Sequence, residues 1–476
     1  MALGICSVSL WQPWLERDPN QVALNHAGQT LTWQALDSQV AHYAKALREQ
    51  GVRSGEVVTL VGKNHLPTVL WFLACTQVGA LCAFVAPQPV ARLQEKLATL
   101  YAEQSPKHLW LAPSCALSEE DITALNAGLL SLPDEWDESV GGEKVSSQFS
   151  CEQLATLIFT SGSTGTPKAV AHTHQQHLAS ARGLLNKFAF IESDSWLLSL
   201  PLYHISGVAI LYRWLAVGAT LKIGTGDLQN DIAGVTHASL VPTQLKRLLD
   251  SSSQLTLKRV LLGGSHIPVE LAQMAATRGI DTWLGYGMTE AASTVTAKQV
   301  DGLAGNGELL DHRELRLVDG RIFIAGKTLA QGYYRQGQLV PLTNEQGWFD
   351  SKDLGRWQGN NLLIDGRADN LFISGGENVH CEEIEAVLNQ HPHVQVAIVI
   401  PVQDSEFGAR PVAVIRSEAE WCQAIGDTWC QGKLEKFKWP IMYFLLSDAL
   451  LDGGIKVSRK AVKAWLAANQ TQFTPL

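Results

Sequence analysis

The chain has 476 residues, of which 46% are hydrophobic and 17% are charged, and its formal net charge is −9. One undivided core is excluded, because single cores stop growing near about 300 residues, and this composition also excludes a disordered chain. The acidic balance argues against a general binder of nucleic acid or anionic membranes, since such proteins present a basic surface. The net negative charge is still compatible with an anionic small-molecule substrate that is bound by a few local cations.

The cysteines and the apolar stretches bear on where the protein works. Eight cysteines are scattered without CxxC spacing, which favours free thiols and a cytoplasmic location. The first 20 residues lack the basic and apolar regions of a signal peptide, so export is not expected. Apolar stretches such as residues 66–85 are interrupted before they reach the about 18 residues of a membrane span. We therefore expect no membrane span, and the sequence leaves open whether the chain forms a homo-oligomer.

Helical and strand patterns alternate near the N-terminus. The predicted elements, in order, are a helix over residues 32–51, a strand over 57–61, a helix over 68–78, a strand over 80–85, a helix over 90–104 and a strand over 109–111. Thr32 is the expected N-cap of the first helix, and Gly51 its stop. Such alternation indicates βαβ units with a parallel sheet, and hence the α/β class.

The remaining elements are less regular. Residues 113–151 are rich in acidic residues, Ser, Gly and Pro, and we expect a surface connection with little buried structure. The α/β pattern resumes over residues 157–159, 240–249 and 260–264, and short strands over 315–318 and 321–325 predict a β-rich portion. A boundary is predicted near residues 365–369, followed by a helix over 381–389 and a strand over 395–401.

One loop combines small residues with a lysine. It reads Thr160-Ser161-Gly162-Ser163-Thr164-Gly165-Thr166-Pro167-Lys168 and follows the apolar strand at 157–159. Small residues let the backbone approach a ligand closely, while hydroxyls and one cation suit a polyphosphate. The loop is not a Walker A motif, which places Gly-Lys-Ser/Thr at the start of a helix. The alternative interpretation is a flexible Ser/Gly loop without a ligand.

Further motifs follow in a fixed order along the chain. They are Pro201-Leu202-Tyr203-His204-Ile205-Ser206-Gly207, Gly285-Tyr286-Gly287-Met288-Thr289-Glu290, Trp348-Phe349-Asp350-Ser351-Lys352-Asp353-Leu354-Gly355, Asp365-Gly366-Arg367-Ala368-Asp369 and Gly375-Gly376-Glu377-Asn378-Val379. With the Ser/Thr-Gly loop they resemble the adenylate-forming superfamily of acyl-CoA synthetases, luciferases and adenylation domains. The resemblance implies a large N-terminal domain of α/β layers plus a β-rich portion (residues 1–366), and a small mobile α+β C-terminal domain (367–476) with its hinge near Asp369.

The resemblance also implies which residues bind ATP and Mg²⁺. Thr289 would bond the α-phosphate, and Glu290 would be the Mg²⁺ ligand, which suits a hard cation that prefers carboxylate and water oxygens. Asp353 and Arg367 would bond the ribose hydroxyls, although such a pair is by itself more often a surface ion pair. The other implied nucleotide-binding residues are Thr160, Ser161, Gly162, Ser163, Thr164, Gly165, Lys168, Gly264, Ser265, Gly285, Tyr286 and Gly287.

The segment Asp452-Gly453-Gly454-Ile455-Lys456-Val457-Ser458-Arg459 resembles the one that carries the catalytic lysine of adenylation. The usual form has Gly directly before that lysine, whereas Ile455 stands there in this chain. We predict that Lys456 meets the α-phosphate and the attacking carboxylate; the alternative is a solvated lysine in a turn. Family members run two half-reactions, and Gly375 and Gly376 would line the site where the CoA thiol attacks the acyl-adenylate.

A resemblance to one subgroup of the superfamily indicates which carboxylic acid is the substrate. The stretches His204-Ile205-Ser206-Gly207, Tyr212-Arg213-Trp214-Leu215, residues 236–244 and 262–268, and Thr289-Glu290-Ala291-Ala292-Ser293-Thr294 resemble the o-succinylbenzoate:CoA ligases of menaquinone biosynthesis. Arg213 stands among apolar neighbours, where a cation needs a partner, and o-succinylbenzoate has a second carboxylate to offer. The alternative is a snorkelling or ion-paired arginine. The resemblance places His204, Gly263 and Ser293 with Arg213 at the acid site, with His204 near the reacting carboxylate rather than as a buried structural residue.

Other functions stay open at this stage. Another aryl- or fatty-acid:CoA ligase would share the mechanism. A non-catalytic nucleotide-binding protein would not need to retain Lys168, Glu290, Asp353 and Lys456. A carrier-loading adenylation module would need a carrier partner. His172-x-His174-x-x-His177 suggests a metal site, but zinc needs further ligands in a closed geometry, so we interpret the three histidines as structural.

Overall fold

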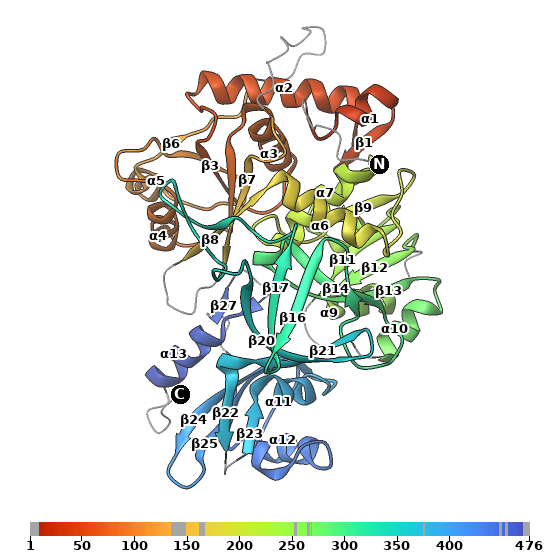
Figure 1. Ribbon diagram of the computed structural model, residues 1–476, viewed down its shortest axis with the longest axis vertical. Helices are drawn as coiled ribbons and strands as arrows, with labels where there is room; N and C mark the ends of the chain where they lie inside the picture. Colours follow the sequence, from red (N-terminus) through yellow and green to blue (C-terminus); the bar gives the residue numbers. More distant parts are fainter. Residues whose placement is uncertain are drawn as a thin grey trace.

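The computed structural model describes residues 9–134, 149–160, 167–251, 255–263, 267, 269–374, 377–446, 450–452 and 456–469. Figure 1 shows a large body in red to green and a smaller group of elements in blue, which holds the last strands and helices of the chain. Mixed helices and strands confirm the α/β class expected from the sequence.

The first large sheet has eight described strands, and its centre is parallel. Every residue of Val57–Val61 and Leu81–Val85 is buried, as expected for strands covered by helices on both faces. In sheet order the strands are β19 (Gln338–Val340), β18 (Gly332–Arg335), β8 (Lys168–Thr173), β7 (Leu154–Thr160), β4 (Leu81–Val85), β3 (Val57–Val61), β5 (His108–Leu111) and β6 (Gly128–Leu129).

The second large sheet has nine described strands. Its middle is parallel, while the pairs of β13 with β14 and of β14 with β15 are antiparallel. In sheet order the strands are β15 (Glu308–Leu309), β14 (Ser293–Gln299), β13 (Asp281–Met288), β12 (Arg259–Leu262), β11 (His237–Leu240), β9 (Ser195–Leu198), β10 (Thr220–Ile223), β1 (Val22–His26) and β2 (Gln29–Thr32).

Three smaller sheets follow. One contains β16 (Arg313–Val318), β17 (Arg321–Gly326), β20 (Phe349–Gln358) and β21 (Asn361–Arg367); the next contains β23 (Glu377–His380), β22 (Leu371–Ser374), β25 (Gly408–Ser417), β24 (Val394–Asp404) and β26 (Tyr443–Leu445); the last pairs β27 (Leu451–Asp452) with β28 (Lys456–Val457). The first of them supplies the antiparallel pair β20–β21, which brings Asp353 opposite Arg367.

Helices cover the sheets and connect their strands (Figure 1). They are α1 (Gln12–Arg17), α2 (Trp33–Glu49), α3 (Leu66–Val78), α4 (Val90–Leu100), α5 (Glu119–Leu125), α6 (His174–Leu185), α7 (Ile205–Val217), α8 (Leu228–Asp231), α9 (Pro242–Asp250), α10 (Val269–Ala276), α11 (Cys381–Leu388), α12 (Gln423–Cys430) and α13 (Arg459–Asn469), with short 3₁₀ turns η1 (Thr289–Ala291), η2 (Ala368–Asn370) and η3 (Lys436–Lys438).

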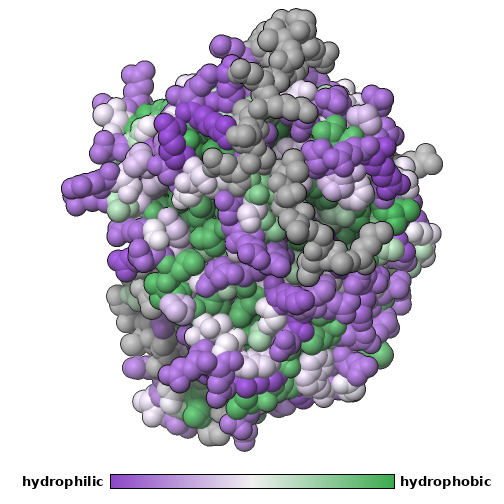
Figure 2. Space-filling model, turned by 45° about the horizontal axis from the view of Figure 1, so that its top comes forward, coloured by the Kyte–Doolittle hydropathy of each residue, from purple (hydrophilic) through white to green (hydrophobic). Residues whose placement is uncertain are grey.

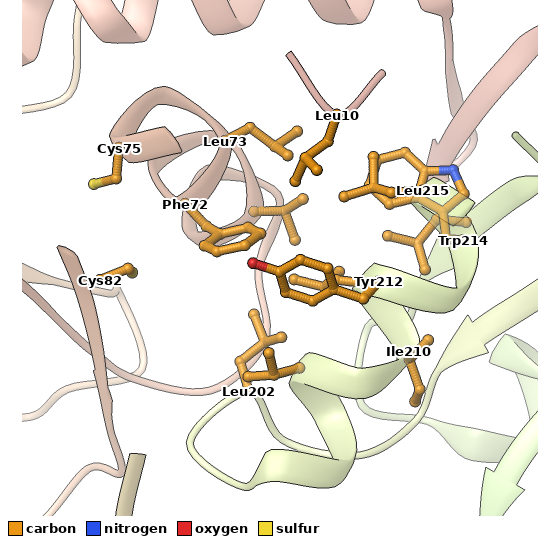
Figure 3. Close-up of a cluster of buried hydrophobic side chains, with 14 of the residues drawn as sticks. Leu10, Phe72, Leu73, Cys75, Cys82, Leu202, Ile210, Tyr212, Trp214 and Leu215 are labelled. Carbon is orange, nitrogen blue, oxygen red and sulfur yellow. The ribbon is translucent and has the colours of Figure 1, made fainter. Parts of the chain in front are cut away.

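One continuous apolar core connects the two large sheets. It draws side chains from α2, α3, α6 and α7 as well as from strands of both sheets. Figure 3 shows Phe72 of α3 and Tyr212 of α7 facing each other, and their ring centroids lie 6.0 Å apart. Because α3 packs on the first sheet and α7 on the second, this contact is one of those in the core that hold the two sheets together.

Most sequence predictions near the N-terminus are confirmed. The Thr32 hydroxyl accepts a hydrogen bond from the Ala35 N–H and caps α2, and β3 has the predicted bounds. Residues 113–134 are mostly exposed, as expected for a surface connection, although the short α5 and β6 form within them. Ser118 and Asp121 form a capping box that supports α5, a local signal that the acidic composition obscured. The predicted helix over 90–104 ends earlier, at Leu100.

The surface shows no large apolar face in the view of Figure 2, where hydrophobic residues appear in separate groups among hydrophilic ones. Within the described residues, no helix has the length and the apolar character needed to cross a bilayer. The seven cysteines in that part of the chain are all free thiols.

The three clustered histidines belong to the core. His172, His174 and His177 are almost fully buried, His174 Nδ1 lies 2.8 Å from the Tyr212 hydroxyl, and His177 Nε2 lies 2.7 Å from Thr156 Oγ1. Burial lowers the pKa of His172 and of His174 to about 3, and the backbone of Thr289 partly opposes the shift at His172. Burial and the neighbouring rings lower the pKa of His177 well below its ordinary value. All three imidazoles are therefore neutral at pH 7.

These neutral histidines predict a loss of stability in acid. In the unfolded chain a histidine takes up a proton below about pH 6.5, whereas His172 and His174 resist it in the folded protein down to pH about 3. The unfolded state therefore binds more protons as the pH falls through this window, so the free energy of unfolding decreases, by about 2 kcal/mol per histidine at pH 5. Urea unfolding of His172→Leu at pH 7 and pH 5 should show a smaller decrease than the wild type, whereas variant His393→Gln, at an exposed position, should match it. An equal decrease in His172→Leu and wild type would contradict this account.

Candidate active site

The predicted Thr289 and Glu290 lie in a tight turn between β13 and β14. Both Ala292 and Ser293 adopt the left-handed conformation, with φ of +49° and +95°. The two strands approach so closely that a Cβ on Gly287 would lie 1.9 Å from the Ser293 carbonyl oxygen, so only glycine fits there. The turn therefore presents Thr289, Glu290 and Ser293 together at one end of the second large sheet.

Lys168 and Glu290 are brought together by a residue that the sequence did not single out. The Tyr333 hydroxyl donates to Glu290 Oε1 at 3.1 Å, and the Lys168 ammonium lies 5.1 Å from the centre of the Tyr333 ring. Burial and the Glu290 charge both raise the pKa of Tyr333, so its hydroxyl keeps the proton that it donates. No local sequence signal identified Tyr333, because its partner stands 43 residues away.

This end of the site suits a polyphosphate and a divalent cation. Thr160 pairs with Lys168 across β7 and β8, and the Lys168 ammonium lies beside Tyr333, which bonds Glu290. A single carboxylate fits Mg²⁺, which commonly takes one or two protein carboxylates and completes its shell with phosphate oxygens and water. The predicted Ser161, Gly162, Ser163, Thr164 and Gly165 lie outside the described residues, so their role stays a prediction.

Asp353 and Arg367 lie next to each other, as the sequence predicted for the ribose end. Tyr286 Oη donates to Asp353 Oδ2 at 2.5 Å, and Arg367 Nη1 lies 3.3 Å from Asp353 Oδ1. Burial raises the pKa of Asp353, and the Tyr286 hydrogen bond and the Arg367 charge oppose that rise. The ionised carboxylate keeps further acceptor positions, which a vicinal diol could use. Arg367 also bonds Asp369 of η2, with Nε–Oδ1 at 2.9 Å and Nη2–Oδ2 at 3.2 Å.

Arg213 is a buried cation in α7. Its residue is 2% exposed, which contradicts the snorkelling alternative, and it forms no ion pair with any described residue. The guanidinium carbon lies 5.2 Å from the centre of the Trp196 ring, and Nε has no hydrogen-bond partner in the same part of the chain. Burial and the charge of Arg313 lower the pKa of Arg213 to about 9. An anion beside a buried guanidinium in this state would offset the cost of burying its charge.

A second buried arginine, Arg313, holds the turn that carries Ser293. Its Nε donates to the Thr294 carbonyl at 2.9 Å, and its Nη2 donates to Ser180 Oγ at 2.9 Å. Ser180 Oγ in turn donates to the Ala292 carbonyl at 2.5 Å. The sequence analysis missed both Arg313 and Ser180, which lie 133 residues apart and meet only in the fold. They fix the left-handed residues of the turn in place.

His204 and Gly263 lie at ends of elements, where a ligand has access. His204 directly precedes α7, and its ring lies 4.9 Å from that of Tyr203. The first turn of α7 packs tightly, since a Cβ on Gly207 would lie 2.2 Å from the Pro201 carbonyl oxygen. Gly263 follows β12, and no atom lies within 4 Å of the Cβ position built on it, so packing does not require glycine there. Ligands commonly bind outside the carboxyl ends of parallel strands, which is where Gly263 stands.

The remaining predicted residues are only partly described. Asp369 lies in η2, directly after β21. The backbone of Lys456 forms β28 and pairs with Asp452, but the position of its side chain is not described. Gly264, Ser265, Gly375 and Gly376 lie outside the described residues. The roles of all these residues stay predictions.

Comparison with known protein families identifies the chain. The model of the AMP-binding enzyme family matches residues 11–334, more than half of the sequence. The chain belongs to the AMP-binding enzyme family. The match covers the second large sheet, most of the first and the turn with Thr289 and Glu290, whereas β19, Asp353 and Arg367 lie beyond its end.

Among curated members of the AMP-binding family, the chain is similar to 2-succinylbenzoate–CoA ligases. It is 43% identical to the enzyme of Salmonella typhimurium, over 96% of this chain and 98% of that protein. It is 41% identical to the enzyme of Escherichia coli, over 97% of this chain and 98% of that protein. This similarity extends beyond residue 366 and thus includes the segment with Lys456.

Solved structures of AMP-binding enzymes have the same fold. A variant of MenE from E. coli with bound OSB-AMS superposes with a TM-score of 0.85 at 39% identity, covering 98% of this chain and all of that one. O-succinylbenzoate coenzyme A synthetase from Bacillus subtilis, in complex with ATP and magnesium ion, gives 0.80 at 25% identity, covering 92% of this chain and 95% of that one.

The role expected for Asp353 at the ribose of ATP can be tested by substitution. Replacing the carboxylate in Asp353→Asn keeps the shape but removes the charge that faces Arg367, so the KM for ATP should rise at least tenfold, because hydrogen bonds to a charged group contribute about 1.5–3 kcal/mol. Steady-state kinetics with varied ATP would measure it. The control Asp250→Asn, whose ion pair with Lys246 is exposed on α9, should leave the KM for ATP unchanged. A KM within twofold of wild type for Asp353→Asn would exclude Asp353 from the nucleotide site.

Proposed function

We propose that this chain is a 2-succinylbenzoate–CoA ligase, which activates o-succinylbenzoate with ATP and transfers it to CoA in menaquinone (vitamin K2) biosynthesis. The observation that carries the choice of acid is Arg213, a buried guanidinium that has no ion-pair partner among the described residues. A dicarboxylic acid can place one carboxylate on this cation while the other reacts. The similarity to curated ligases of this name over nearly the whole chain supports the same assignment.

The reaction runs in two steps. An oxygen of the reacting carboxylate attacks the α-phosphorus of ATP, the bond from that phosphorus to the bridging oxygen breaks, and pyrophosphate leaves with an acyl-adenylate formed. The sulfur of CoA then attacks the acyl carbon, the bond from that carbon to the AMP oxygen breaks, and AMP leaves while the thiol proton passes to solvent. Negative charge builds on phosphoryl oxygens in the first step, so cations and donors held in position supply most of the catalysis.

The described residues support this assignment of roles. Lys168, with Tyr333 and Glu290 beside it, would hold the departing phosphates, and Glu290 would hold the Mg²⁺ that neutralises part of their charge. Thr289 would donate to the α-phosphate. Asp353 and Arg367 would bond the ribose.

The acid would lie between the turn that carries Ser293 and the start of α7. His204 would stand near the reacting carboxylate and Ser293 beside the acid, while Arg213 would hold the second carboxylate. Lys456 would meet the α-phosphate during adenylation, and Gly375 and Gly376 would line the path of CoA in the second step. Each of these roles is a proposal that a single substitution can test.

The division into two domains is also part of the proposal. Residues 1–366 would bind nucleotide and acid, residues 367–476 would carry Lys456, and Asp369 would be the hinge. In support, the strands of the five-stranded sheet all come from residues 371–445, and Asp369 stands in the short turn before them. The free thiols support a cytoplasmic location. The oligomeric state is not assigned.

A panel of acids tests the substrate. With ATP, Mg²⁺ and CoA supplied, we expect AMP and acyl-CoA to form faster from o-succinylbenzoate than from benzoate or octanoate, because only the diacid offers Arg213 a counter-charge. Chromatography of the acyl-CoA products identifies the acid that was used. Faster turnover of benzoate or octanoate would instead assign the chain to the aryl- or fatty-acid ligases of the same family.

Arg213 tests how the diacid is recognised. In Arg213→Met the neutral side chain keeps much of the length, so the KM for o-succinylbenzoate should rise by at least tenfold, while the KM for ATP stays within twofold. The KM for a monocarboxylic acid should change little, because such an acid has no second carboxylate to lose its partner. The matched control is Arg247→Met, an exposed arginine of α9. An unchanged KM for the diacid in Arg213→Met would show that Arg213 is structural.

A further inference from the structure

Arg459 begins α13 only three positions after Lys456, and its surroundings are unusual for a helix start. A cation in the first turn of a helix is unfavourable, because the helix dipole places positive charge there. Arg459 is nevertheless largely buried, with 24% of its side chain exposed. Its position must therefore be explained by the groups around it rather than by helix propensity.

Those groups come from α11 and β24. Arg459 Nη2 donates to Glu385 Oε1 at 2.5 Å, Nη1 to Glu382 Oε1 at 3.3 Å, and Nε to the Val399 carbonyl at 3.2 Å. Glu385 Oε1 also accepts the Val399 N–H at 2.7 Å. All three nitrogens of the guanidinium are thus used, and the planar fork fixes the first turn of α13 in direction as well as in distance.

The same cluster reaches the turn that follows the ribose site. Asn370 Nδ2 of η2 donates to Glu382 Oε1 at 2.5 Å, so Glu382 bonds both η2 and α13. A Cβ on Gly366 would lie 2.8 Å from His380 Nδ1 and 3.0 Å from Glu382 Oε2, so the end of β21 packs against this cluster directly.

Apolar contacts hold both β28 and α13 on the sheet, since Val457, next to Lys456, packs against the same cluster as the helix. Val462 and Leu466 pack against Ile400, Val402, Val412 and Val414 and hold the helix on the sheet. Such contacts are non-directional and allow small shifts along the helix axis. Arg459 supplies the directional contacts, and from it to Lys456 the chain spans at most about 10 Å.

We propose that Arg459 is a positioning residue for adenylation: by bonding Glu382 and Glu385 of α11, it fixes the start of α13 and with it β28, which carries Lys456. The inference rests on the proposed role of Lys456 in the first half-reaction. It implies that loss of Arg459 impairs the attack of the carboxylate on ATP, because a displacement of about 1 Å at a reacting group can lower a rate by about 10²-fold. Thioester formation, for which we expect Lys456 to matter much less, should keep its rate.

The chemistry of Glu385 makes the test practicable. Burial raises the pKa of Glu385 to about 7, and Arg459 and the Val399 N–H oppose that rise. When Arg459 is removed, Glu385 can take up a proton instead of remaining as an unpaired buried charge, so Arg459→Met is expected to fold. Glu385→Gln provides a second variant, which keeps the shape and removes the carboxylate.

The test measures the two half-reactions separately in the full-length enzyme. Adenylation is followed by pyrophosphate release in a single turnover without CoA, and thioester formation starts from preformed o-succinylbenzoyl-adenylate with CoA. We expect Arg459→Met to lower the first rate by about 10- to 100-fold and the second by no more than twofold. Arg459→Lys, which keeps the charge but not the fork, should recover part of the loss. Lys460→Met, at the next and exposed position of α13, is the control and should leave both rates unchanged.

The coupling between partners gives an independent measurement. If Arg459 acts through Glu385, the double variant Arg459→Met/Glu385→Gln should lose no more adenylation than Arg459→Met alone. Additive losses, equal losses in both half-reactions, or no loss in either would each overturn the proposal. Lys456→Ala is measured alongside and should lower adenylation by about 10²- to 10³-fold.

The variant Lys456→Ala also distinguishes a failure of this inference from a failure of the proposed function. An intact rate of adenylation in Lys456→Ala would refute the role of Lys456 and with it this inference. A normal rate in Arg459→Met beside a defective Lys456→Ala would refute the inference alone. If the wild type adenylates another acid instead of o-succinylbenzoate, the substrate assignment fails, and the same comparison of rates with that acid still decides the role of Arg459.

Discussion

The hydrogen bonds that hold the turn from Thr289 to Ser293 are the contacts on which the candidate site depends. The Ala330 N–H donates to the Glu290 carbonyl at 2.8 Å, and Tyr333 of β18 donates to the Glu290 carboxylate, so the turn is bonded to the first large sheet. Ser180 of α6 holds Ala292 from the other side. Two consecutive non-glycine residues in the left-handed region are unfavourable and persist only where the surroundings determine them. The turn therefore joins the two sheets and fixes Glu290 and Ser293, at which we propose that phosphate and acid bind.

Buried positive charge explains why this fold suits an anionic acid. Arg313 satisfies its guanidinium with carbonyl and hydroxyl oxygens, so its charge is solvated by the protein itself. Arg213 has the face of Trp196 and an unpartnered Nε instead, within the described residues. Burying a cation without an anion costs several kcal/mol, and a carboxylate at Arg213 would recover part of this cost only when the substrate is bound. The affinity that we propose for a second carboxylate would thus follow from a charge that the described residues leave uncompensated.

Features could be predicted from the sequence where the residues that interact are close together along the chain. The capped helix α2 and the buried strand β3 follow from local patterns, and they were predicted almost to the residue. Arg213 stood out because its apolar neighbours are adjacent in sequence. Tyr333, Ser180 and Arg313 could not be found in this way, since each meets its partner through pairing of strands and helices far apart in the chain. Residues 113–151 were expected to be a surface connection, and the exposed α5 within it was not predicted, because average composition does not reveal the capping box at Ser118.

The ribose end and the segment with Lys456 are connected by a continuous path of polar contacts. Tyr286 of β13 bonds Asp353, Asp353 faces Arg367, and Arg367 also bonds Asp369 in η2. The next residue, Asn370, bonds Glu382, which in turn accepts from Arg459. Arg367 contacts two carboxylates, those of Asp353 and Asp369. A hydroxyl ligand bound to Asp353 would compete with the contact between Arg367 and Asp353, so the contact between Arg367 and Asp369 would become relatively stronger. Coupling between two sites is reciprocal, so if this path couples them, a variant that loosens α13 would also change the affinity that we propose Asp353 has for ribose.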